Sequence, residues 1–331
     1  MRRSLPVPLL AAALALGACG GRGEVEAEPP IRVVVLQDGR VPDALELVSP
    51  VVLSVELALD EGVALGRLPA GSGIRVIDVA DPARSVGEAA AAAADPSVVA
   101  AVVAPFVDAP WAVEELLGAG VPVVSLSGRG PAPRDGPWRR LVPTDDEVEA
   151  GRASLAGPHA CSADEVTVLP TIAACTGVLA DADADEAIAL RTTLDRVGAT
   201  RVPLVVGPLA RVARLARAYP TMVGTLAAGP CRGIDTSAAP AAQRFVHAFQ
   251  AAHGLPVGPC AAEAYGFGRW LVDRLAAGAA ARTDVARALE TLTRLPTPAG
   301  PITFDAMGER EAPGVAFEEV VGVRWLPVVA G

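Results

Sequence analysis

Between residues 31 and 125, four short apolar segments alternate with helix-forming segments. Residues 31–36 and 98–103 are almost continuously apolar, as strands are when both faces of a sheet are covered. We predict strands at 31–36, 74–79, 98–103 and 121–125, with helices over 49–61, 83–94 and 111–117 between them. Gly62 is expected to end the first of these helices. Strands that alternate with helices in this way predict a parallel sheet with right-handed crossovers.

The alternation continues more weakly in the rest of the chain. Residues 128–143 are rich in Gly, Pro and Arg and are expected to form a loop. The expected strands are 166–169, 202–206, 222–226, 302–304 and 317–325. The expected helices are 147–155, 186–197, a helix opened by Gly207-Pro208, 241–253, 261–277 and 283–293. The fold class predicted from this order is α/β, with two doubly wound lobes.

The first thirty residues have the pattern of an export signal. Arg2 and Arg3 precede a mainly apolar segment, residues 5–16, which is shorter than the roughly 20 residues that span a bilayer. Small residues then lead directly to Cys19. The ending Leu-Gly-Ala-Cys resembles the lipobox of bacterial lipoproteins. We therefore expect a signal peptide over residues 1–18, a lipid anchor on Cys19 at the outer face of the cell membrane, and a flexible tether over 19–30.

The charge of the chain excludes one class of partner. The formal net charge is −10, and all 28 basic residues are arginine. Nucleic acid attracts basic surfaces, so we expect no nucleic-acid partner. Arg211, Arg214 and Arg217 recur at three-residue spacing. We interpret this row as a solvated helix face, with an anion site as the alternative.

Four cysteines remain beside Cys19. In an exported protein an even number favours disulfides, and Cys161, Cys175, Cys231 and Cys260 allow three pairings. We favour the local pairs, Cys161 with Cys175 and Cys231 with Cys260. A zinc site that uses His159 and Cys161 is the alternative, but no CxxC or HxxxH spacing supports it. We expect no metal and no cofactor.

The motifs of the common enzyme classes do not occur in the sequence. A P-loop needs a lysine, and the chain has none. The segment from Ser125 to Gly130 comes nearest to a G-x-S-x-G elbow but lacks its first glycine. An enzyme is therefore not expected, and a cell-surface hydrolase is the least favoured alternative.

Several stretches resemble the periplasmic leucine/isoleucine/valine-binding proteins, the type I solute-binding proteins of ABC transporters. These stretches are residues 95–105 (DPSVVAAVVAP), 120–127 (GVPVVSLS), 141–145 (LVPTD) and 300–305 (GPITFD). The resemblance implies two lobes, joined by three crossings, that close around a ligand. It places lobe 1 at residues 31–143 and 240–303, and lobe 2 at 144–239 and 304–331.

The resemblance also implies where a ligand binds, although this chain departs from the family pattern there. Residues 105–108 (PFVD) stand where relatives usually have a serine pair, and Gly128-Arg129 where they often have a small residue and a hydroxyl. Arg129 could hold a carboxylate and Asp108 an ammonium group; the alternative for Arg129 is an ordinary surface arginine. The expected ligand-binding residues are Asp108, Ser127, Gly128, Arg129, Thr171, Gly207 and Gly229.

The function implied is a lipid-anchored, monomeric receptor outside the cytoplasm. It would capture a small polar solute, an amino acid or a related carboxylate or amide, and deliver it to an ABC permease. The alternative is a degenerate binding fold that acts as a sensor or a structural lipoprotein without transport.

Overall fold

The computed structural model describes residues 28–130, 132–133, 136–165, 172, 174–218, 220–231, 234, 239–279, 281–311 and 314–328. The predicted signal peptide, most of the predicted tether and the predicted strand 166–169 lie outside these residues. Within the described ranges, no helix is both long enough and apolar enough to cross a membrane.

The first lobe is built on a five-stranded sheet in which every neighbouring pair is parallel. The strand order is β2-β1-β3-β4-β5. All six residues of β3 are buried, because helices cover both faces of the sheet. The strands are β1 (Arg32–Gln37), β2 (Gly73–Asp78), β3 (Val98–Val103), β4 (Val123–Ser125) and β5 (Trp138–Arg140). The segment 128–143, expected to be all loop, contains β5, so that expectation was wrong for these three residues.

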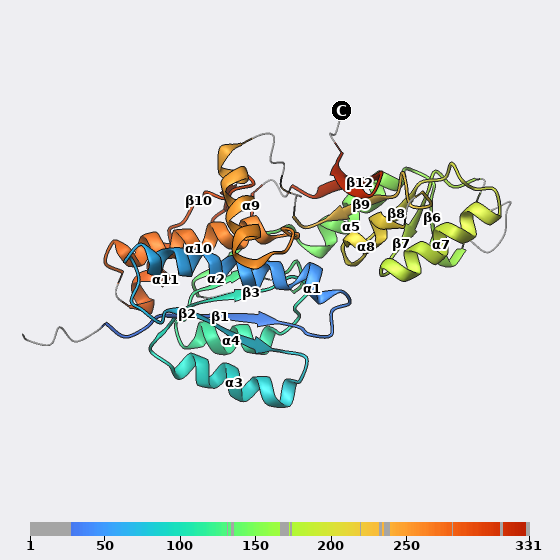
Figure 1. Cartoon of the computed structure of the whole chain (residues 1–331). Helices are drawn as coiled ribbons and strands as arrows, with labels where there is room; N and C mark the ends of the chain where they lie inside the picture. The colour runs from blue at the N-terminus through green and yellow to red at the C-terminus, as the bar shows by residue number, and fades with distance from the viewer. Residues whose placement is uncertain are drawn as a thin grey trace, which may run out of the picture.

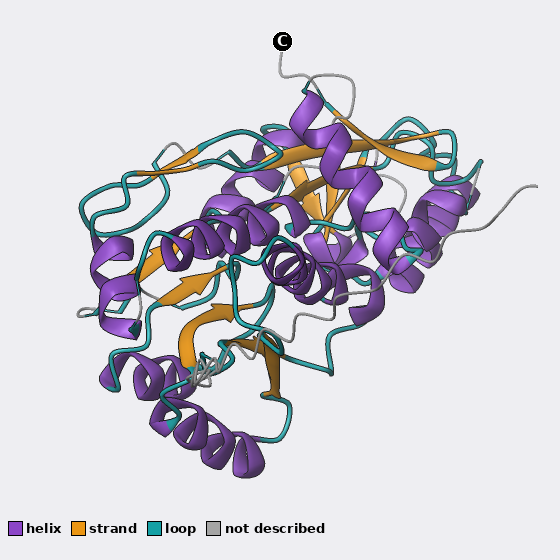
Figure 2. Ribbon diagram, turned by 60° about the vertical axis from the view of Figure 1, so that its left-hand side comes forward, coloured by secondary structure: helices purple, strands orange, loops and turns teal. Residues whose placement is uncertain are grey.

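The helices of this lobe lie on opposite sides of the sheet (Figures 1 and 2). Figure 1 shows α3 and α4 on one side, with α2, α10 and α11 on the other. A two-stranded sheet of β10 (Arg294–Leu295) and β11 (Ile302–Thr303) adjoins them. The helices are α1 (Ala44–Leu47), α2 (Ser49–Ala64), α3 (Pro82–Ala94), α4 (Pro110–Gly118), α9 (Pro240–His253), α10 (Ala261–Ala276) and α11 (Arg282–Glu290).

Gly62 lies inside α2 and does not end it, contrary to the sequence-based expectation. A Cβ at Gly62 would stand 2.9 Å from Val272 Cγ1, on the facing helix α10. Gly268 of α10 has no room for a side chain either, because its Cβ would lie 2.6 Å from the Cβ of Ala58. The two glycines therefore serve the close packing of α2 on α10.

Tyr265 joins the same two helices through a partly buried hydrogen bond. Its hydroxyl donates to Glu61 Oε2 at 2.6 Å, and Arg269 Nη1 donates to the same carboxylate oxygen at 2.8 Å. Burial and the hydrogen bond to Glu61 raise the pKa of Tyr265 to about 12.

We therefore expect Tyr265 to ionise well above the ordinary tyrosine value of about 10. A raised pKa stabilises the fold below the unfolded value of about 10, and this contribution is lost as the pH rises through the folded value. Absorbance titration of phenolate in a Tyr219→Phe variant should show one transition near pH 12. A transition near pH 10 in the folded protein would contradict the burial of this hydroxyl.

The second lobe is built on a six-stranded sheet of order β13-β12-β9-β8-β7-β6. Strands β6 to β9 are parallel, and the hairpin of β12 and β13 adds to them in antiparallel fashion. The strands are β6 (Ala160–Ser162), β7 (Gly177–Ala180), β8 (Leu204–Val206), β9 (Leu226–Gly229), β12 (Ala316–Val321) and β13 (Arg324–Pro327). The helical elements are α5 (Asp145–Ala156), η1 (Ala163–Glu165), α7 (Ala184–Arg196), η2 (Pro208–Ala210) and α8 (Ala213–Arg217).

Two strand predictions for this lobe were wrong in detail. Residues 222–224 form a turn, and β9 begins only at Leu226. The predicted strand 317–325 is a hairpin, because Gly322 adopts a φ of 63° between β12 and β13. Such a φ favours glycine, which permits the reversal.

The arginine row does not form a solvated helix face. Gly207-Pro208 opens the short 3₁₀ turn η2, so Arg211 precedes α8. Arg211 is buried, and its Nη2 lies 2.6 Å from Glu318 Oε2 on β12. Arg214 and Arg217 form ion pairs with carboxylates of other elements. Tertiary partners therefore overrode the sequence pattern.

Among the described elements, the chain passes between the lobes from β5 to α5, from β9 to α9 and from β11 to β12. The division of the chain at residues 143, 239 and 303 stays a prediction. The favoured disulfide pairing is confirmed, with bonds Cys161–Cys175 and Cys231–Cys260. Because Cys161 forms a disulfide bond with Cys175, it is not available as a zinc ligand. Cys231 follows β9 in the second lobe and Cys260 precedes α10 in the first, so this disulfide links the two lobes.

Candidate functional site

The candidate site lies at the carboxyl ends of β1, β3 and β4 in the first lobe. Ends of parallel strands meet at one edge of a sheet, where open α/β sheets bind ligands. Asp38 follows β1, Asp108 lies after β3, and Arg129 lies after β4. The hydrogen-bonded guanidinium of Arg40 lowers the pKa of Asp38, and Arg129 acts in the same direction. Arg129 therefore lies within electrostatic range of the segment after β1.

Ser127 joins the loops after β3 and β4. Its hydroxyl is buried, donates to the carbonyl of Val107 at 2.8 Å, and accepts the amide of Arg129 at 3.2 Å. The neighbouring Ser125 hydroxyl donates to the carbonyl of Ser127 at 3.0 Å. Both hydroxyls thus bond within the protein, and Ser127 positions the backbone on which Arg129 stands.

Gly128 occupies a position that has no room for a side chain. A Cβ there would stand 2.8 Å from both Asp145 N and Pro143 O. The carbonyl of Gly128 accepts the Asp145 amide at 3.1 Å and Arg140 Nη1 at 2.8 Å. The close approach brings the loop after β4 against the start of α5, which belongs to the other lobe.

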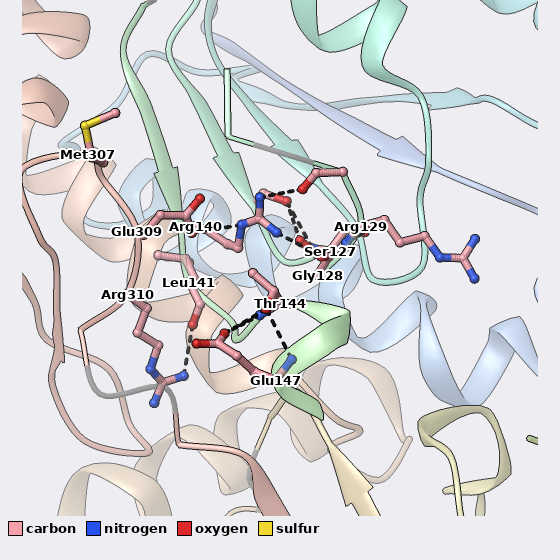
Figure 3. A network of polar contacts seen from close by, with 12 residues as sticks. Ser127, Gly128, Arg129, Arg140, Leu141, Thr144, Glu147, Met307, Glu309 and Arg310 are labelled. Carbon is pink, nitrogen blue, oxygen red and sulfur yellow. Dashed lines mark hydrogen bonds and ion pairs between the residues drawn. The ribbon is translucent and has the colours of Figure 1, made fainter. Parts of the chain in front are cut away.

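Arg140 supports this loop from the buried side, as Figure 3 shows. Its Nη2 donates to the carbonyl of Gly130 at 2.8 Å, and its Nε lies 3.0 Å from Glu309 Oε2. The Arg140 side chain is only 1% exposed. Burial raises the pKa of Glu309, and Arg140 opposes that rise. The sequence reasoning missed Arg140, because the segment was expected to be loop.

The same contacts reach two of the chain crossings. Arg310 Nη1 donates to the carbonyl of Leu141 at 3.0 Å, and the Arg140 amide donates to the carbonyl of Gly308 at 2.9 Å. Thr144 and Glu147 then form a capping box that begins α5 (Figure 3). We name Arg140, Leu141, Glu309 and Arg310 the hinge network, because it connects the site loop to both crossings.

A cavity of about 750 Å³ opens beside this loop. Val103, Val113, Leu117 and Trp138 give it a largely apolar wall. Asp108, Ser127 and Arg129, three of the residues predicted to bind ligand, also line it. The described residues that line it all belong to the first lobe.

Among the described residues that line this cavity, Arg129 carries the cationic group. Its side chain is 43% exposed, and its Nε lies 3.6 Å from Asp145 Oδ2. The guanidinium extends away from the buried Arg140 (Figure 3). A planar guanidinium can hold a carboxylate through two parallel hydrogen bonds. A ligand carboxylate at this position would compete with Asp145.

Gly207 and Gly229, both predicted in the second lobe, do not line the cavity. Thr171 lies outside the described residues. Gly207 follows β8, where its Cβ would contact Arg152 Nη1 at 3.5 Å. Gly229 ends β9, and a Cβ there would stand 3.0 Å from Arg211 Cδ. Gly229 thus makes room for the buried pair of Arg211 with Glu318, a role that the sequence did not reveal.

Among the described residues, no group of three or more His, Cys, Asp or Glu side chains is placed to hold a metal ion.

No family model and no curated protein sequence matches this chain. Solved structures match nearly all of it at low sequence identity. An ABC transporter substrate-binding protein from Desulfitobacterium hafniense, in complex with Leu, shares 18% identity with a TM-score of 0.68, covering 91% of this chain and 100% of that one. A possible leucine/isoleucine/valine-binding protein from Rhodopirellula baltica shares 14% sequence identity with a TM-score of 0.71. The match covers 92% of this chain and 97% of that one. A solute-binding protein from R. palustris, in complex with benzoate, shares 14% sequence identity with a TM-score of 0.65. The match covers 91% of this chain and 96% of that one.

The chain therefore has the type I periplasmic-binding-protein fold, as the sequence predicted. At the level of fold, its resemblance to the leucine/isoleucine/valine-binding proteins is confirmed.

Proposed function

We propose that this chain is a solute-binding protein that captures a small carboxylate at the carboxyl edge of its first lobe, with the second lobe closing over it, and delivers it to an ABC permease. The observation that carries the proposal is the cavity at the carboxyl edge of the first sheet, with an apolar wall and the half-exposed Arg129. The two-lobed fold supports it, because such folds close by hinge motion around a ligand.

The chemistry of the cavity favours an amino acid or a related carboxylate or amide. Arg129 offers a guanidinium for a carboxylate, and Asp108 offers an acceptor for an ammonium or amide group. Valine, leucine and tryptophan side chains in the wall suit an apolar body. Leu and benzoate, bound by two proteins of the same fold, both combine a carboxylate with an apolar body.

We expect a ligand of this class to raise the melting temperature. Binding to the folded state alone stabilises it by about 2.7 kcal/mol at a concentration one hundred times Kd. The panel to measure by thermal shift contains leucine, benzoate, their amides and neutral analogues of the same size. Arg129→Gln should weaken binding of the carboxylates about 10- to 100-fold, since a hydrogen bond to a charged group contributes about 1.5–3 kcal/mol.

Arg84→Gln is the matched control, because it also removes one exposed cation with a carboxylate partner, Glu88, and both residues lie on α3, which does not line the cavity. This variant should bind as the wild type does. If no carboxylate or amide shifts the melting temperature of the wild type, the proposed function loses its support. If Arg84→Gln weakens binding as much as Arg129→Gln, Arg129 has no specific role.

We further propose that Cys19 anchors the protein by lipid outside the cytoplasm. The support is the lipobox-like ending of the apolar segment at Cys19. Two acyl signals hold a protein stably, whereas one holds it only marginally. Cys19→Ala is expected to move the protein from the membrane fraction to the supernatant, as measured by fractionation and by the mass of the N-terminal peptide. An unchanged membrane fraction would rule out this anchor.

Two observations favour the alternative of a sensor without transport. The Ser127 hydroxyl bonds within the protein, and Arg129 already lies near Asp145. Genes for a permease and an ATPase beside this one would argue against the sensor. A ligand that shifts stability, without such neighbouring genes, would support it.

A further inference from the structure

The two lobes meet through charged side chains as well as through the chain crossings. Figure 1 shows α1 at the end of the first lobe that faces the second, with α8 across from it. The two terminal nitrogens of Arg214, on α8, form ion pairs in different lobes. Its Nη2 lies 2.8 Å from Asp43 Oδ2 beside α1, and its Nη1 lies 2.7 Å from Asp185 Oδ2 on α7. One side chain of the second lobe thus holds a carboxylate from each lobe.

Glu46 on α1 makes the second contact between the lobes. Its Oε2 accepts the backbone amide of Ala213, the first residue of α8, at 2.6 Å. The first amides of a helix have no partner within the helix, so this carboxylate fills that role from the other lobe. Arg217 Nη2 lies 3.7 Å from Glu46 Oε1. Two carboxylates of the first lobe therefore face two arginines of the second.

These contacts adjoin the disulfide that links the lobes. The backbone of Gly258, two residues before Cys260, packs closely on Glu46, since a Cβ at Gly258 would stand 2.7 Å from the carbonyl oxygen of Glu46. In the second lobe, Arg211 stands two residues before Ala213. Its Nη1 donates to the carbonyl of Cys231 at 3.0 Å. The charged contacts and the Cys231–Cys260 bond therefore restrain the same part of the lobe boundary.

We propose that Asp43, Glu46, Arg214 and Arg217 form an inter-lobe clasp that sets how far the two lobes open. All of these contacts come from the chain itself, so the arrangement of the lobes that holds them gains stability without a ligand. A separation of the lobes breaks the pairs of Arg214 with Asp43 and of Glu46 with Ala213 and Arg217, while Arg214 keeps Asp185. The clasp thereby shifts the population of closed protein, to which a ligand that bridges the lobes would bind.

The proposal concerns lobe closure and needs no ligand, so its test is separate from that of the proposed function. The measurement is the radius of gyration by small-angle X-ray scattering, on the Cys19→Ala form of the full chain. Salt screens half-exposed ion pairs, because the Debye length falls from about 10 Å at 0.1 M to about 3 Å at 1 M. We expect the radius of gyration of the parent form to rise between low and high salt, with unchanged scattering mass.

Two variants break the clasp from opposite sides, Arg214→Gln/Arg217→Gln in the second lobe and Asp43→Asn/Glu46→Gln in the first. Both should show the larger radius of gyration already at low salt, and little further change at high salt. The matched control for the arginine variant is Arg84→Gln/Arg287→Gln, which removes two exposed cations with partners on their own helices, Glu88 and Asp284. This control should follow the parent form.

Circular dichroism identifies any variant that loses its fold, in which case the variant from the other lobe decides the outcome. If a folded clasp variant has the radius of gyration of the parent form at both salt concentrations, the clasp does not set lobe opening. The same conclusion follows if the control variant opens as far as the clasp variants.

Discussion

Replacing Arg140 with methionine is expected to lower the free energy of unfolding by about 3–5 kcal/mol, the range for breaking a buried ion pair by removal of one partner. Arg140 is almost fully buried and serves Glu309 and the carbonyls of Gly128 and Gly130. Methionine keeps much of the side-chain volume but leaves these oxygens without their donor. Chemical denaturation measures the loss.

The pH dependence of the free energy of unfolding distinguishes the loss of the Arg140 charge from the loss of its side-chain packing. In Arg140→Met, Glu309 loses the cation that opposes the rise of its pKa. A raised carboxyl pKa means that its stabilising contribution is present below the unfolded value and is lost as the pH rises through the folded value. The variant should therefore be most destabilised at neutral pH and should recover in part when Glu309 is protonated.

A double-mutant cycle provides the control. Arg140→Met/Glu309→Leu removes both charges, so it should cost less than the sum of the two single variants. Arg40→Met removes an arginine whose pair with Asp38 is exposed, and it should change stability little. If the losses of stability in Arg140→Met and Glu309→Leu add up to that of the double variant, with no pH dependence, Arg140 acts only by its volume.

Removing the Cys231–Cys260 disulfide is expected to cost about 3.6 kcal/mol, from the chain entropy of a loop that closes over a sequence separation of 29. The Cys161–Cys175 bond closes over a separation of 14 and should contribute about 3 kcal/mol by the same relation. The variants to compare are Cys231→Ala/Cys260→Ala and Cys161→Ala/Cys175→Ala, by chemical denaturation without reductant.

The two variants should also differ in which part of the protein they loosen. Cys231 and Cys260 belong to different lobes, whereas Cys161 and Cys175 both lie beside β7 in the second lobe. Hydrogen exchange should therefore rise in α10 and β9 for the first variant, and in β6 and β7 for the second. A first variant that exchanges faster only within one lobe would contradict a link between lobes.

Much of the fold could be predicted because its strands carry a local signal. Residues 98–103 are six apolar residues in a row, and β3 is buried along its whole length. By contrast, β5 is short and contains Arg139 and Arg140, whose burial depends on partners far along the chain. Arg139 donates to the carbonyl of Glu290, and Arg140 pairs with the carboxylate of Glu309. Neither partner can be assigned from sequence alone.

The candidate site was predictable in place but not in detail. Asp108, Ser127 and Arg129 line one cavity because each follows a parallel strand of the same sheet. The bond from Ser127 to the carbonyl of Val107 depends on how two loops meet, which no local pattern specifies. The row of Arg211, Arg214 and Arg217 was misread for the same reason, since its partners lie on α1, α7 and β12.

The packing of α2 on α10 has a consequence for the order of folding. These helices touch through Gly62, Gly268 and Tyr265, yet about two hundred residues separate them along the chain. In a chain that emerges from its N-terminus, the side of α2 that packs on α10 stays exposed until residues 261–276 arrive. Contacts between distant residues slow folding, because a long loop must close before they form. The second lobe is continuous along the chain except for its final hairpin, so we expect its parallel strands to gain protection from exchange before the first lobe is complete.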